Sequence, residues 1–78
     1  MTNENITYEK FLRTVPEIAR YHEWRYGQAL FNVLSKVRPQ LAEEIRGGQL
    51  DPFYRDRDGV VPELWSFLES QWDLEYAG

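Results

Sequence analysis

The chain has no cysteine, and this absence excludes several classes of protein. Without thiols the protein can form no disulfide scaffold, use no thiol nucleophile and bind no zinc ion through sulfur. The sequence also lacks any apolar run near the length of about eighteen residues that spans a bilayer. Residues 1–7 have neither the basic nor the apolar segment of a secretory signal. We therefore expect a cytoplasmic protein with no membrane partner.

Basic side chains are also in short supply. The chain has 9 lysines and arginines against 13 acidic residues, which gives a net charge of −4. Residues 1–40 carry a net charge of +2 and residues 41–78 a net charge of −6. Because phosphate backbones repel an acidic protein at long range, we expect no direct binding to nucleic acid.

Apolar and aromatic side chains are plentiful: 42% of the 78 residues are apolar and 15% are aromatic. That supply is enough for a hydrophobic core, so a folded chain is expected. No repeat or Gly/Ser-rich linker divides the sequence. We predict a single domain over residues 1–78, in which residues 1–6 and 74–78 are flexible.

Apolar residues recur at the helical period, and no segment shows the sustained alternation of a strand. The sequence therefore predicts an all-α fold, a compact bundle of four to five short helices. The clearest helix covers about residues 61–73, with one apolar face formed by Val61, Leu64, Trp65, Leu68 and Trp72. A second helix over residues 23–37 should end before Pro39, which begins a short helix that Gly47 and Gly48 stop.

The N-terminal third contains two potential helix starts. Thr7 can cap a short helix, and Thr14 and Glu17 have the spacing of a capping box at the start of another. The pattern leaves open whether residues 16–37 form one helix or two, and we favour a break or kink near His22.

A group of polar residues occurs among apolar neighbours on the second helix and in the loop that precedes the last one. Asp51 can cap a single turn that folds Phe53 and Tyr54 onto the core. Its polar neighbours could bond this turn to the second helix or line a shallow recognition site, and we favour the structural role. This candidate structural network comprises Arg25, Gln28, Asn32, Asp51 and Tyr54.

No group of residues points to catalysis or to metal binding. His22 is the single histidine, and no serine lies in a nucleophile-elbow sequence. The run 56–59 resembles part of a calcium loop, but Tyr54 and Trp65 occupy the first and twelfth positions, where carboxylates are required. We therefore predict that the protein is not an enzyme and that it has no catalytic residue, metal site or cofactor.

Aromatic residues outside the apolar helix faces are candidates for binding a protein, because tryptophan, tyrosine and arginine dominate binding hot spots. Acidic residues near the C-terminus could bind a basic partner. The candidate protein-binding residues are Trp24, Phe31, Phe67, Glu69, Asp73 and Glu75. The partner is then a protein, either another protein or a second copy in a homodimer, and the sequence leaves monomer and homodimer open.

Residues 25–32, 39–42, 45–47 and 51–54 combine into a spaced pattern, R-x-G-Q-A-L-F-N, P-x-L-A, I-R-G and D-P-F-Y. The pattern resembles a group of short, functionally uncharacterised proteins encoded by bacteria and their phages. The resemblance covers about residues 24–72 and implies no catalytic residue and no cofactor.

These observations predict a non-enzymatic, phage-related protein-interaction module that binds or inhibits a bacterial host protein. The alternative is an acidic mimic of nucleic acid that occupies a basic groove on a nucleic-acid-binding protein. Its acidic surface would be the segment 63–78, which has four acids and no cation.

Overall fold

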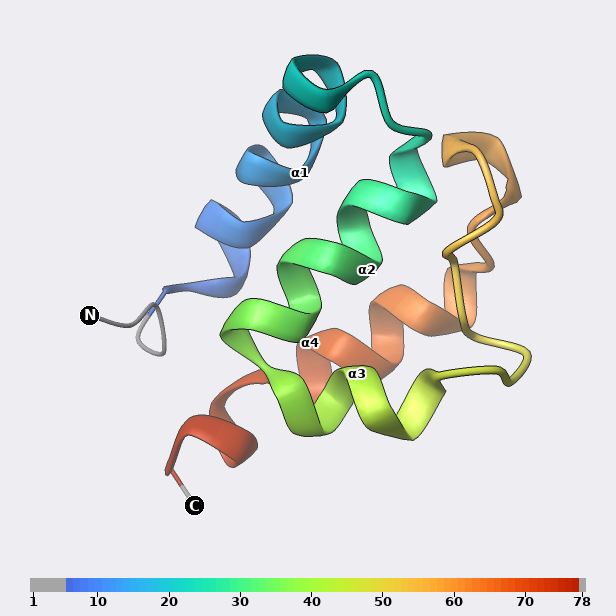
Figure 1. Cartoon of the computed structure of the whole chain (residues 1–78). Coiled ribbons are helices and arrows are strands. Elements are labelled where there is room, and N and C mark those ends of the chain that lie inside the picture. The colour runs from blue at the N-terminus through green and yellow to red at the C-terminus, as the bar shows by residue number, and fades with distance from the viewer. Residues whose placement is uncertain (1–5, 78) are drawn as a thin grey trace.

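The computed structural model describes residues 6–77, and the side chains as far as Trp72. The described chain forms four α-helices and one 3-10 turn: α1 (Tyr8–His22), α2 (Tyr26–Val37), α3 (Pro39–Ile45), η1 (Arg57–Gly59) and α4 (Pro62–Ala77). It contains no strand, so the all-α prediction is confirmed. Figure 1 shows α1 beside α2, α3 turning away from the end of α2, and α4 crossing behind them. Residues 1–5 and 78 lie outside the described residues, and the flexibility of the chain ends stays a prediction.

The first helix begins where the sequence predicts it, because the Thr7 side chain accepts a hydrogen bond from the Lys10 backbone N–H at 3.0 Å. The second start predicted at Thr14 is wrong. Its hydroxyl donates to the Lys10 carbonyl, 2.8 Å away, and α1 continues through Pro16 without interruption. A proline removes only one helical hydrogen bond, and the fully buried Val15 beside it keeps this part of α1 on the core.

A left-handed residue separates α1 from α2. Glu23 has φ 57° and ψ 39°, and its backbone N–H donates to Arg20 while that of Trp24 donates to Ala19. This pair of bonds satisfies the last carbonyls of α1 and turns the chain. Residues 16–37 therefore belong to two helices, as the favoured break requires, and α2 begins at Tyr26 instead of residue 23.

Proline and glycine set the ends of α3 as predicted. Arg38 has the extended φ of −146°, α3 begins at Pro39, and Gly47 follows the helix with φ 74°. The last helix extends farther than predicted, to Ala77.

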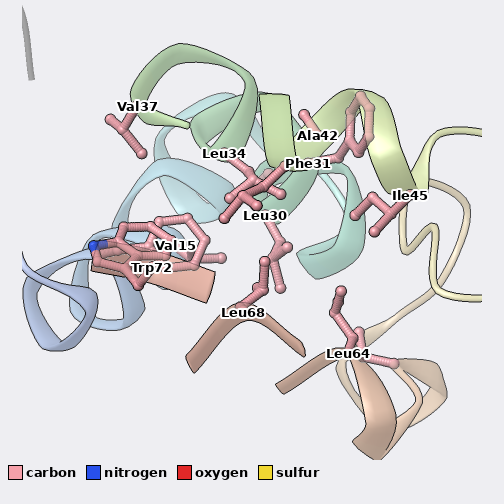
Figure 2. Packing of buried hydrophobic residues seen from close by; sticks show 14 residues of the cluster. Val15, Leu30, Phe31, Leu34, Val37, Ala42, Ile45, Leu64, Leu68 and Trp72 are labelled. Atoms are coloured by element: carbon pink, nitrogen blue, oxygen red, sulfur yellow. The ribbon is translucent and has the colours of Figure 1, made fainter. Parts of the chain in front are cut away.

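All four α-helices contribute to one apolar core, together with Val60 before α4 (Figure 2). Two sequence predictions need correction here. Phe31, a candidate protein-binding residue, is 6% exposed because it lies on the same side of α2 as the core residue Leu34. Trp65, expected in the core, is half-buried beside the fully buried Leu64. The core residues are Phe11, Val15, Ala29, Leu30, Phe31, Leu34, Val37, Leu41, Ala42, Ile45, Val60, Leu64, Leu68 and Trp72.

The loop after α3 packs its backbone directly on the first turn of α2. The Gly27 backbone N–H donates to the Arg55 carbonyl at 2.9 Å. A Cβ atom at Gly27 would overlap the carbonyl oxygens of Pro52 and Arg55, so this contact requires glycine. Phe53 packs against the core as predicted, whereas Tyr54 is 83% exposed, which corrects the prediction that it folds inward.

Candidate functional site

Three aromatic side chains gather at the turn between α1 and α2, and we name Tyr21, His22 and Trp24 the aromatic corner. The His22 ring stacks on Trp24 with centroids 4.1 Å apart and an interplanar angle of 15°. Tyr21 meets His22 edge-on at 4.9 Å and is 81% exposed, whereas Trp24 is half-buried against the core. The left-handed turn at Glu23 brings Trp24 back over the end of α1, so the local backbone builds this cluster.

The other predicted protein-binding residues do not join the aromatic corner. Phe31 is buried, and Phe67 is half-buried against the core. No ring contact connects either of them with Trp24 among the residues whose side chains are described. Glu69 is exposed on α4. The side chains of Asp73 and Glu75 lie outside the described part of the structure.

The predicted polar network does not form as a unit. Arg25 lies 3.7 Å from the carboxylate of Asp56, not from that of Asp51. Asp51 instead accepts hydrogen bonds from the backbone N–H groups of Gly47, at 2.7 Å, and Phe53, at 2.9 Å. Asp51 thus bonds within its own loop, whereas Asp56 pairs with a residue at the start of α2.

The remaining members of that network are the half-buried Gln28 and Asn32 and the exposed Tyr54. In the described part of the chain, their side chains make no hydrogen bond to one another or to Asp51. The expected bonding of the 51–54 turn to α2 is therefore replaced by the backbone contact at Gly27.

A cleft of about 410 Å³ lies where α1, α2, η1 and α4 meet, and it was not predicted. We name it the η1 cleft; its lining is Leu12, Tyr26, Arg57, Asp58 and Trp65. The guanidinium carbon of Arg57 lies 5.2 Å from the centroid of the Tyr26 ring. Burial raises the pKa of the Tyr26 hydroxyl, and the charge of Arg57 lowers it in part. No local pattern signals this pair, because 31 positions separate the two residues in the sequence.

Tyr8 lies beside Trp65, since its hydroxyl donates to the Trp65 carbonyl at 3.4 Å. Burial raises the pKa of Tyr8 to about 12, and the carboxylate of Glu69 and the Tyr26 hydroxyl act in the same direction. Tyr8 is therefore a neutral donor at physiological pH.

A second cavity, of about 430 Å³, is lined by the loop residues Gly47, Gly48, Asp51, Tyr54 and Arg55. Its charged groups are engaged within the loop: Asp51 holds backbone N–H groups, and Arg55 donates to the Gly59 carbonyl at 3.2 Å. This cavity therefore has fewer charged groups available to bind a ligand than the η1 cleft, where Arg57 forms no ion pair with another described side chain.

Within residues 6–77, no group of three or more histidine, cysteine, aspartate or glutamate residues is placed to hold a metal ion. Over the same residues, no helix combines the length and apolar character needed to cross a membrane. No protein-family model, curated protein sequence or solved structure matches the chain.

Proposed function

We propose that the protein is a non-enzymatic protein-interaction module, phage-related and cytoplasmic, that binds or inhibits a bacterial host protein. The observation that supports this proposal best is the aromatic corner. It presents a large, 81% exposed tyrosine next to a stacked histidine–tryptophan pair at one turn.

Such a cluster suits a protein partner for two physical reasons. Tryptophan and tyrosine dominate binding hot spots because they bury large areas with few rotatable bonds. The ring contacts already hold His22 and Trp24 in one geometry, so less side-chain entropy is lost on association.

The acidic-mimic alternative places the contact on the exposed carboxylates of α4. Glu63 and Glu69 are both exposed, and neither forms an ion pair among the residues whose side chains are described. A contact of this kind depends on charge, so it weakens steeply with salt, whereas aromatic docking does not.

An affinity-capture experiment separates the two proposals. The baits are the full wild-type chain, a corner variant with Tyr21→Ala and Trp24→Ala, and an acid variant with Glu69→Gln, Asp73→Asn and Glu75→Gln. Our proposal predicts a captured protein that resists a rise from about 50 to about 300 mM salt. The corner variant should reduce its capture about tenfold or more, and the acid variant should leave it unchanged.

The mimic predicts the reverse pattern, with capture lost in the acid variant and in high salt. Circular dichroism of each bait controls for folding, and Lys36→Ala, an exposed change on α2, serves as the matched surface control. Capture that is equal for wild type and corner variant would contradict the proposed function.

A further inference from the structure

We propose that the η1 cleft binds a peptide segment of a partner protein in which a carboxylate lies next to an aromatic or aliphatic side chain. In this arrangement Arg57 holds the carboxylate, and the apolar side chain packs against Leu12 and Trp65. The inference goes beyond the proposed function, because it names the chemistry of a partner segment and does not depend on the aromatic corner.

Arg57 is the charged anchor of the proposed site. The chain has more acids than bases, yet the Arg57 guanidinium forms no ion pair and no side-chain hydrogen bond among the residues whose side chains are described. Asp56, its neighbour, pairs with Arg25 instead. The guanidinium is held on the Tyr26 ring, and its planar fork of N–H donors matches a carboxylate in a two-bond arrangement.

Two further residues that line the same cleft, Tyr26 and Trp65, carry donor groups. The Tyr26 hydroxyl is neutral, and the Trp65 indole carries an N–H group. Neither group has a hydrogen-bond acceptor among the described residues. Three donor-bearing residues around one cavity favour a ligand rich in acceptors, and the half-buried Leu12, Tyr26 and Trp65 favour one with an apolar body.

The charge balance of the cleft favours a single negative charge over a phosphate. Asp58 lines the cleft together with Arg57, so the two side chains offset each other, and the whole chain carries −4. A dianionic phosphate would meet about twice the repulsion from Asp58 that a singly charged carboxylate meets, and a single guanidinium matches the charge of the carboxylate. The Asp58 carboxylate can in turn accept a hydrogen bond from a backbone N–H of the peptide.

The volume of the cleft fits a short segment. At about 410 Å³ it lies toward the lower end of the range of about 300–1,000 Å³ that is usual for small-molecule sites. The site therefore has room for a few groups and not for a whole helix.

The test uses the full chain labelled with ¹⁵N, and N-acetylphenylalanine as the probe. The chain has three tryptophans, so its spectrum contains three indole N–H signals, and Trp65→Phe identifies the signal of Trp65. We expect the probe to shift the Trp65 indole signal with a dissociation constant of about 1 mM, as suits a ligand of about fifteen non-hydrogen atoms. The signals of Trp24 and Trp72 should stay in place.

Two comparisons test the carboxylate and its anchor. N-acetylphenylalaninamide, which lacks the charge, should bind about tenfold more weakly, because a charge-assisted bond is lost. Arg57→Gln should weaken binding of the acid by a similar factor. Arg46→Gln removes the same charge from an exposed arginine that pairs with Glu43, so it is the matched control and should bind as the wild type does.

Several results would overturn the proposal. Equal binding of the acid and the amide would show that the cleft does not recognise the carboxylate. Binding of phenyl phosphate that is tighter than that of the acid would indicate a phosphate site. If the Trp65 signal does not shift at a probe concentration 20-fold above the expected dissociation constant, the cleft does not bind this class of ligand. Because the probes need no partner protein, such a failure would be separate from a failure of the aromatic corner in the capture experiment.

Discussion

The guanidinium of Arg38 lies 4.4 Å from the centroid of the Trp72 ring, and its Nε donates to the Trp72 backbone carbonyl at 3.0 Å. The Ile6 carbonyl accepts from both residues, from Arg38 Nη2 at 3.2 Å and from Trp72 Nε1 at 3.0 Å. One buried arginine therefore joins the start of the chain, the junction of α2 and α3, and the last helix. These three segments are far apart in the sequence, so the contact stabilises the tertiary arrangement and not a single helix.

The first prediction concerns this arginine, which is only 2% exposed. Arg38→Ala removes the arginine's hydrogen bonds to the Val37, Trp72 and Ile6 carbonyls together with the cation–π contact, so it should cost about 4 kcal/mol. That loss could unfold so small a domain, so Arg38→Lys, which keeps the charge but not the fork of donors, should cost about 2 kcal/mol. Urea unfolding measures both variants. Lys36→Ala should stay within about 0.5 kcal/mol of wild type, and an equally small effect of Arg38→Lys would contradict the assigned role.

The second prediction concerns the close approach at Gly27. In an open helix, Gly→Ala stabilises by roughly 1 kcal/mol. Here the new methyl group would overlap the backbone of the 52–55 turn, so Gly27→Ala should instead destabilise by about 3 kcal/mol. Gly48→Ala is the matched control, because its Cβ would meet only the Ile45 carbonyl at 3.6 Å. Thermal unfolding followed by circular dichroism measures both variants, and a stabilised Gly27→Ala would show that the turn does not pack there.

The sequence was sufficient to predict the features that depend on local chemistry. The cap at Thr7, the helix boundary at Pro39 and the stop at Gly47 each depend on residues within a few positions. The apolar period also identified α4, because burial of Leu64, Leu68 and Trp72 follows directly from helical spacing.

Features that depend on long-range contacts could not be predicted. The sequence pattern gives no sign that Arg38 is buried, because its burial requires α4 and residue 6 to meet it in space. The η1 cleft likewise depends on a pair 31 positions apart. The capping-box spacing at Thr14 predicts a helix start that does not occur, because the buried Val15 keeps α1 continuous on the core.

The third prediction uses the left-handed residue at the end of α1. Glu23 pays a steric penalty at φ 57° that glycine avoids, so Glu23→Gly should stabilise the protein by about 0.5–1 kcal/mol. The same change in the middle of α1, Glu17→Gly, should destabilise by about 1 kcal/mol. Chemical denaturation of the two variants gives the comparison. A loss of stability in both would argue against the left-handed cap.

The fourth prediction separates two interpretations of Asp51. Its carboxylate accepts two backbone hydrogen bonds, so Asp51→Ala should cost about 1–2 kcal/mol. Arg25 pairs with Asp56 instead, so the double variant Asp51→Ala with Arg25→Ala should be additive within about 0.5 kcal/mol. A coupling free energy well above that value in the double-mutant cycle would restore the direct pairing of Arg25 with Asp51.

The last prediction follows from the pKa of Tyr8, which burial and Glu69 raise from 10.0 to about 12. The folded state holds the phenol proton more tightly than the unfolded state, so the free energy of unfolding should fall as the pH rises from about 10 to about 12. Tyr8→Phe removes this titration and loses only a 3.4 Å hydrogen bond at neutral pH. Its free energy of unfolding should therefore fall less steeply with alkaline pH than that of the wild type. Tyr26, whose pKa is also raised, makes the free energy of unfolding depend on alkaline pH in both proteins. Urea unfolding at pH 8, 10 and 11 measures the difference, and parallel alkaline slopes for wild type and Tyr8→Phe would show that Tyr8 is not protected in the fold.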